Sequence, residues 1–171
     1  MIEFKRVTSD QVEILRKISI ETFYTSFYHL NTPENYELYT AKALSTDTLL
    51  KELNHSNSDF FFGYLDQKLV CYFKLNLNIN SFEQYSSDSL EIQRIYVLPE
   101  YFSKGIGALC IDFIKKFSLE RDFKFIWLGV WDQNERARLF YQRHGFTQKG
   151  SHEFLLGNDR QTDLILECSL V

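Results

Sequence analysis

The sequence predicts a mixed α/β fold with one central sheet that is mostly antiparallel and contains one parallel strand pair. Short strand-like runs joined by turns lie in the first half and at the end of the chain, which indicates antiparallel hairpins. Between them, a strand, a helix, a strand and a helix follow in that order, which places two covered strands parallel. At 171 residues the chain is expected to form a single domain over 1–171.

The predicted elements follow from hydrophobic periodicity and from the residues that start and stop helices and strands. In chain order they are a strand over 2–7, helices over 8–29, 34–43 and 45–53, strands over 60–65, 69–77 and 90–98, a helix over 103–121, a strand over 125–131, a helix over 134–143, and strands over 150–156 and 162–171.

Helix-start signals define the three early helices. Thr8-Ser9-Asp10-Gln11 has the capping-box pattern, in which a Thr and a Gln three residues later satisfy each other's backbone donors. Pro33 suits the first turn of the second helix, because its missing N–H would have no partner there. Ser45-Thr46-Asp47 offers hydroxyl and carboxylate caps for the third.

Turn signals define the strands that follow. Asp66-Gln67-Lys68 separates two apolar runs and predicts a tight antiparallel turn. A polar loop is expected over 78–88. The near-continuously apolar run over 125–131 indicates a strand covered on both faces, and Gly157-Asn158-Asp159 predicts the turn of a closing hairpin.

Composition and charge exclude several classes of protein. Hydrophobic residues make up 44% and charged residues 25%, as in ordinary globular proteins. The net charge of −4 argues against nucleic acid as a partner and suits a small cationic molecule better. Because no apolar run approaches the roughly 18 residues of a membrane span, and the start of the chain lacks a signal-peptide pattern, no membrane partner and a cytoplasmic location are expected.

The cysteines and histidines predict no metal site. The three cysteines lie far apart among apolar neighbours, which is typical of buried thiols, and the four histidines form no ligand motif. These residues are Cys71, Cys110, Cys168, His29, His55, His144 and His152.

Two glycines at the start of the helix over 103–121 indicate a candidate phosphate site. Apolar residues recur on one face of this helix, and Gly105 and Gly107 lie in its first turn. Glycine costs roughly 1 kcal/mol in a helix relative to alanine, so the pair suggests a backbone that something approaches closely. Helix N-termini bind phosphates, and Lys104 could add a charge. For an isolated pair, tight packing is the favoured explanation.

These glycines and two flanking segments resemble the GNAT acetyltransferase superfamily. Residues 90–97, Leu-Glu-Ile-Gln-Arg-Ile-Tyr-Val, followed by Gly105-Ile106-Gly107, are similar to its motif A. Residues 134–146 are similar to its motif B, in which an Asn is followed seven residues later by a Tyr and then by Gly-Phe. Further stretches across nearly the whole chain resemble the bacterial PaiA-type spermidine/spermine acetyltransferases.

The resemblance implies acetyl-CoA as the cosubstrate, without a metal. It implies that a strand holds the pantetheine arm through backbone bonds, that the loop before the helix surrounds the pyrophosphate, and that an Asn of motif B lines the groove. An Arg at the end of the same helix is a candidate contact for the CoA phosphates, and a solvated helix-end Arg is the alternative. The residues so implied are Ile95, Tyr96, Val97, Phe102, Ser103, Lys104, Gly105, Ile106, Gly107, Asn134 and Arg143. Phe102 departs from the family pattern, which usually has Gln or Arg at this position.

The resemblance also implies two catalytic side chains. An alkylamine with a pKa of about 10.4 costs roughly 4.6 kcal/mol to deprotonate at pH 7, and Glu91 occupies a position where family members place a general base. A solvent-facing strand Glu is the alternative. Tyr141 is the candidate acid, because a phenol can protonate the departing thiolate. The alternative for Tyr141 is a core aromatic.

The expected acceptor is a primary amine of a polyamine such as spermidine or spermine, and Glu21 and Tyr24 are the candidate acceptor-binding residues. Surface acidity explains the early acidic residues equally well. Two other functions remain open: acetylation of a protein N-terminus or ribosomal protein, and CoA binding by a non-catalytic regulatory module. The sequence leaves a homodimer open.

Overall fold

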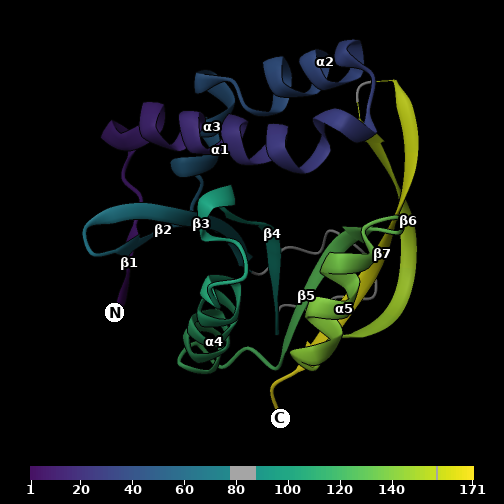
Figure 1. Cartoon of the computed structure of the whole chain (residues 1–171). Coiled ribbons are helices and arrows are strands. Elements are labelled where there is room, and N and C mark those ends of the chain that lie inside the picture. The colour runs from purple at the N-terminus through teal and green to yellow at the C-terminus, as the bar shows by residue number, and fades with distance from the viewer. Residues whose placement is uncertain (78–87, 157) are drawn as a thin grey trace.

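The computed structural model describes residues 1–77, 88–156 and 158–171, and it arranges their strands in one sheet (Figure 1). The strands are β1 (Ile2–Arg6), β2 (Ser58–Leu65), β3 (Lys68–Leu77), β4 (Ser89–Val97), β5 (Phe125–Trp131), β6 (Thr147–Leu156) and β7 (Asp159–Ser169). The helices are α1 (Val12–Phe27), α2 (Pro33–Ala43), α3 (Thr46–Leu53), α4 (Ile106–Leu119) and α5 (Glu135–Arg143), with 3-10 turns η1 (Ser9–Gln11), η2 (Tyr28–Leu30) and η3 (Pro99–Tyr101).

The sheet has the order β1-β2-β3-β4-β5-β7-β6. Strands β4 and β5 pair in parallel, because α4 crosses between them, and the other described pairings are antiparallel. The predicted fold class is therefore confirmed. The predicted loop over 78–88 lies outside the described residues except for Asp88, and so does Gly157 of the closing turn.

Side-chain caps start the early helices where the sequence predicts them. Gln11 accepts a hydrogen bond from the backbone N–H of Thr8 at 3.1 Å, and this box encloses η1 before α1 begins at Val12. Thr32 accepts from the N–H of Asn35 at 3.2 Å ahead of Pro33, and Ser45 accepts from the N–H of Thr48 at 3.2 Å.

The predicted start of the fourth helix was wrong by three residues. Helix α4 begins at Ile106 rather than 103, because Ser103 and Gly105 have φ values of 60° and 76°. A left-handed backbone cannot continue a right-handed helix, so α4 starts only after Gly105. The closing hairpin is longer than predicted, since β6 begins at Thr147 and β7 at Asp159.

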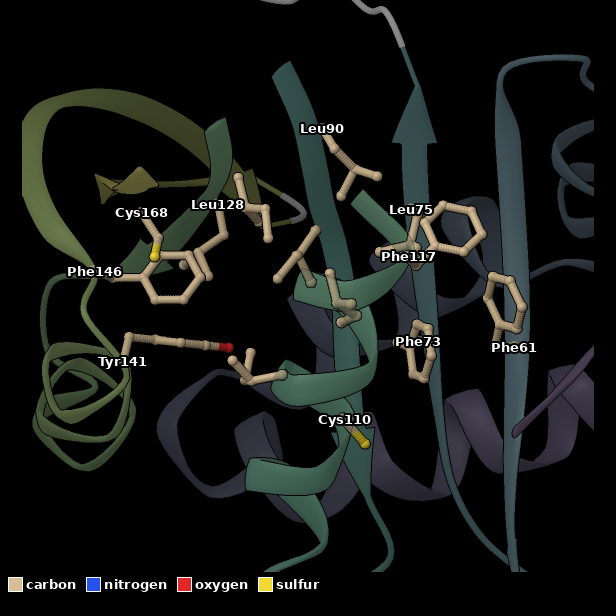
Figure 2. Close-up of a cluster of buried hydrophobic side chains, with 14 of the residues drawn as sticks. Phe61, Phe73, Leu75, Leu90, Cys110, Phe117, Leu128, Tyr141, Phe146 and Cys168 are labelled. Atoms are coloured by element: carbon tan, nitrogen blue, oxygen red, sulfur yellow. The ribbon is translucent and has the colours of Figure 1, made fainter. Parts of the chain in front are cut away.

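The helices cover the two faces of the sheet separately. Helices α4 and α5 pack on one face, where Phe73, Leu75 and Leu90 of the sheet meet Cys110 and other α4 residues (Figure 2). Helices α1 and α3 pack on the other face, and α2 lies against β6 (Figure 1).

Candidate active site

A wedge between β4 and β5 is the central feature of the candidate site. The parallel pairing runs only from Ser89↔Phe125 to Glu91↔Trp127. Beyond Glu91, β4 remains paired with β3, whereas β5 beyond Trp127 remains paired with β7. The two strands therefore diverge, and the backbone of β4 over Ile95–Val97 lies along the open side of the wedge.

A bulge in β4 determines which face of the sheet each side chain beside the wedge points to. The register with β3 passes from Leu75↔Ile92 to Lys74↔Arg94, which leaves Gln93 as the extra residue. Ile92 and Ile95 both pack on the α4 side. Glu91 alternates to the opposite face, and the bulge brings Arg94 to that same face.

The loop before α4 has the conformation of an anion-binding turn. Ser103, Lys104 and Gly105 are exposed, and both Ser103 and Gly105 adopt left-handed φ values. The first N–H groups of a helix have no intrahelical partners, so those at the start of α4 are available to a ligand. A Cβ on Gly105 would meet no atom within 4 Å, which shows that the space beside it is open.

The two glycines at the start of α4 have different structural roles. Gly105 supplies the left-handed turn that precedes α4. A Cβ on Gly107 would lie only 3.2 Å from the Phe140 ring, so Gly107 lets α5 pack closely on α4. For Gly107, tight packing is therefore a sufficient explanation.

Two cationic side chains beside the loop before α4 lie over aromatic rings. The Lys104 ammonium lies 4.9 Å from the centre of the Tyr101 ring, and the Arg136 guanidinium lies 4.9 Å from that of Phe102. Sequence reasoning missed Arg136, although it is in the first turn of α5, two residues after Asn134.

Arg143 and Asn134 lie at opposite ends of α5. Arg143 is exposed in the last turn, next to His144, whose carbonyl accepts a hydrogen bond from Lys115 well along α4. Asn134 is the N-cap of α5, and its Oδ1 accepts from the N–H of Ala137 at 3.1 Å. This cap leaves the amide Nδ2 of Asn134 as a donor for a ligand.

Tyr141 extends from α5 toward α4 (Figure 2). It is 9% exposed, and its ring packs edge-to-face against Phe140 and Phe146. Burial, and secondarily the nearby Cys110 thiol, raise the pKa of the Tyr141 hydroxyl well above its usual value. The phenol therefore stays protonated at neutral pH and can donate a proton.

Glu91 is the last β4 residue before the strands diverge, and it is half-buried rather than solvent-facing. Its carboxylate accepts a hydrogen bond from Asn76 Nδ2 at 2.7 Å. Burial raises the pKa of Glu91, although the Asn76 bond and the charges of Lys74, His152 and Arg94 act in the opposite direction. A carboxylate with a raised pKa is a better proton acceptor than an ordinary Glu.

A buried ion network adjoins Glu91. The Glu52 carboxylate of α3 lies 3.0 Å from Lys74 Nζ. It also accepts two hydrogen bonds from the Arg94 guanidinium, at 2.7 and 3.2 Å. Burial first, and then the neighbouring Arg94, lower the pKa of Lys74 despite Glu52. Burial also opposes the charge on Arg94, but Glu52 together with Tyr72 and Tyr39 outweighs it and raises the pKa of that guanidinium. Glu52 therefore pairs with two cross-strand cations and ties α3 to the sheet.

The candidate acceptor residues Glu21 and Tyr24 lie on the exposed side of α1. Glu21 borders a groove of about 480 Å³ that Leu98 also lines. Leu98 is seven residues beyond Glu91, or roughly 20 Å along an extended strand. Tyr24 stacks on Tyr28 with ring centres 4.4 Å apart. The structure thus does not bring either residue into the cluster around Glu91.

Two general features of the described part of the chain complete the description. No helix in it is long and apolar enough to cross a bilayer. Its His, Cys, Asp and Glu side chains form no group of three or more that could hold a metal ion.

Comparisons with known proteins identify the family. Residues 24–146 match the model of the acetyltransferase (GNAT) family. The chain is 36% identical over 154 residues to an uncharacterised N-acetyltransferase of Lactobacillus delbrueckii subsp. lactis, a match covering 90% of this chain and 89% of the relative. It is 25% identical over 149 residues to the spermidine N(1)-acetyltransferase of Thermoplasma acidophilum, covering 85% and 88% respectively.

A solved structure has the same fold. The PaiA N-acetyltransferase of Thermoplasma acidophilum, in complex with coenzyme A, superposes with a TM-score of 0.81 at 22% identity, over 99% of each chain. Together with the matched family model and the diverging β4–β5 pair, this similarity supports one conclusion. The chain belongs to the GNAT family of N-acetyltransferases.

Proposed function

We propose that the chain transfers the acetyl group of acetyl-CoA to a primary amine of a small polyamine, such as spermidine or spermine, by direct attack. The observation that carries the proposal is the half-buried Glu91 at the apex of the wedge, where its raised pKa suits it to accept an ammonium proton. The spermidine N(1)-acetyltransferase relative supports the choice of acceptor.

In this proposal the wedge holds the cosubstrate. The backbone over Ile95–Val97 pairs with the pantetheine arm as a missing strand would. The loop over Phe102–Gly107 surrounds the pyrophosphate with helix N–H groups and Lys104. Helix α5 supplies side-chain hydrogen-bond donors to the cosubstrate from Asn134, Arg136 and Arg143.

In the proposed reaction, Glu91 on one face of the sheet accepts a proton and Tyr141 on the other face donates one. Glu91, directly or through a water molecule, takes one proton from the ammonium, and the neutral nitrogen attacks the thioester carbonyl. The C–N bond forms as the C–S bond breaks, and Tyr141 protonates the departing thiolate. The second nitrogen proton leaves as the amide forms and restores Tyr141, so each turnover releases one proton to solvent.

The proposal is tested by measuring CoA release with polyamines, aminoglycosides, amino acids and basic peptides as acceptors. A preference for spermidine or spermine is the expected result. A preference for basic peptides or protein N-termini would instead favour the protein-acetylating alternative. Binding of CoA without turnover of any acceptor would favour the regulatory module.

Glu91→Gln is expected to lower kcat/KM for spermidine at pH 7 by about 10- to 100-fold, because the amide cannot accept a proton. In the unmodified enzyme the rate falls as Glu91 becomes protonated. Since the pKa of Glu91 is raised, this fall occurs at a higher pH than for an ordinary Glu. A pH profile of kcat/KM checks both points. A profile that is unchanged in Glu91→Gln would exclude Glu91 as the base.

Glu21 enters the proposal as a surface carboxylate that attracts the cationic polyamine at a distance, because neither Glu21 nor Tyr24 lies in the cluster around Glu91. Glu21→Gln is expected to raise KM for spermidine about threefold, because an exposed carboxylate attracts a cation only weakly. The effect should disappear at high salt, where surface charges are screened. Steady-state kinetics at two salt concentrations measure it, and equal KM values for both enzymes at low salt would remove Glu21 from the acceptor site.

A further inference from the structure

Gly129 is an exposed residue of β5, an inner strand of the sheet. It is exposed although its neighbours Leu128 and Val130 are 1% and 7% exposed. It shares the face of β5 with Trp127 and Trp131, because side chains two residues apart point the same way. This is also the face of Glu91, which is paired with Trp127. The opening over Gly129 therefore lies next to the proposed proton acceptor.

Asp163 and His152 form the far side of this opening. Asp163 of β7 pairs with Trp131 of β5 on one side and with His152 of β6 on the other. A methyl group on Gly129 would lie 3.2 Å from Asp163 Oδ2 and 3.4 Å from His152 Cε1. Both side chains therefore lean over Gly129, toward the β4 strand that carries Glu91.

The electrostatic environment of Asp163 favours a cation. Burial raises the pKa of Asp163, His152 opposes this rise, and the neighbouring Asp132 adds to it. The cations nearest Glu91, Lys74 and Arg94, are both held by Glu52 on the β3 side of the site. The charged groups that act on Asp163 are thus His152 and Asp132, and an ammonium group beside Asp163 would offset the charge of a partly buried carboxylate.

We propose that Asp163, flanked by His152, binds a second ammonium group of the acceptor over Gly129, while the reacting nitrogen lies at Glu91. This inference rests on the proposed function and refines it: the enzyme would select acceptors with two or more amino groups over monoamines. Gly129 is then required because any side chain would fill the space beside Asp163 and His152.

The test compares a polyamine with a diamine and a monoamine, of which 1,3-diaminopropane and propylamine differ only in the second amino group. Steady-state kinetics are measured with spermidine, 1,3-diaminopropane and propylamine for the unmodified enzyme and for Asp163→Asn, which keeps the shape of the side chain. We expect KM for the two polyamine substrates to rise about 10- to 100-fold, with kcat/KM for propylamine changed by less than about threefold. KM for acetyl-CoA should be unchanged.

Control variants separate recognition from folding. Asp163→Glu restores the charge and should recover part of the preference. Gly129→Ala should raise KM for the diamine but not for propylamine, because the added methyl group crowds Asp163 and His152. Asp112→Asn, on the exposed side of α4, removes the same charge elsewhere and should leave all three acceptors unaffected.

The outcomes distinguish this inference from the function on which it rests. Equal losses on propylamine and diaminopropane, or an unchanged preference in Asp163→Asn, would overturn the second-ammonium site and leave polyamine acetylation standing. Absence of polyamine turnover by the unmodified enzyme would overturn both.

Discussion

Tyr141→Phe is expected to lower kcat by about 100-fold or more while KM for acetyl-CoA stays nearly constant. General acid catalysis typically contributes 10²- to 10⁴-fold, and the thiolate would otherwise depart without a proton. The substitution keeps the ring that packs between Phe140 and Phe146, so cosubstrate binding and folding are preserved. Steady-state and single-turnover kinetics with acetyl-CoA measure the effect.

The raised pKa of Tyr141 adds a second signature. Because burial keeps the phenol protonated, activity is expected to persist above pH 10, where an ordinary tyrosine would lose its proton. Tyr64→Phe is the matched control, since Tyr64 lies on β2 near the sheet edge and contacts Lys5. Turnover within about twofold of the unmodified enzyme in Tyr141→Phe would rule out the acid role.

Glu52→Ala is expected to give the largest loss of stability, about 3 to 5 kcal/mol in the free energy of unfolding. Lys74 is 3% exposed, and the Arg94 side chain is 10% exposed, so removing Glu52 leaves two like charges buried on adjacent strands. Removing one partner of a buried ion network lowers the free energy of unfolding by more than the whole network adds to it, because the remaining charges cannot reach water. Thermal and urea denaturation would measure the loss.

The loss in Glu52→Ala should shrink as the pH rises. Arg94 remains charged at any accessible pH, but Lys74 can lose its proton. The charge and the hydrogen bond of Glu52 raise the pKa of Lys74, so this pKa falls further in the variant. The folded variant then binds fewer protons than its unfolded state over a wider pH range, and its stability increases with pH more than that of the unmodified protein. This gain begins as the pH passes through the lowered folded pKa of Lys74 and is complete above its unfolded value.

A surface carboxylate supplies the control for Glu52. Glu120 lies 3.9 Å from Lys116 in an exposed pair on α4, and Glu120→Ala is expected to change stability by about 0.5 kcal/mol or less. Similar losses in the two variants would show that the Glu52 network stabilises the fold no more than a surface pair does.

Much of the fold and the cofactor half of the site is encoded in local sequence. The caps at Thr32 and Ser45 start helices because each side chain bonds a backbone N–H only three residues away. Gly105 and Gly107 indicate a special backbone near the start of α4, although the turn at Gly105, where φ is positive, was predicted as part of the helix. Such signals depend on near neighbours, so they can be read before the tertiary structure is known.

The side chains proposed to bind the acceptor are brought together only by the tertiary structure. Glu52 meets Arg94 across 42 residues of sequence, and Asp163 reaches Gly129 from another strand. No periodicity records such pairs, because they depend on strand order and register. The bulge at Gln93 brings Arg94 to the same face as Glu91, which uninterrupted alternation would not predict.

The sequence by itself determined the family and most element positions, because these depend on contiguous motifs, and it predicted the residues that are proposed to hold the cosubstrate. Only the tertiary structure showed that Glu91 is half-buried, that Gly107 accommodates Phe140, and that Asp163 and His152 border the space over Gly129. Burial and the proximity of charges that are distant in sequence arise only when the chain folds, and they raise the pKa of Glu91 and bring together the side chains that are proposed to meet the acceptor.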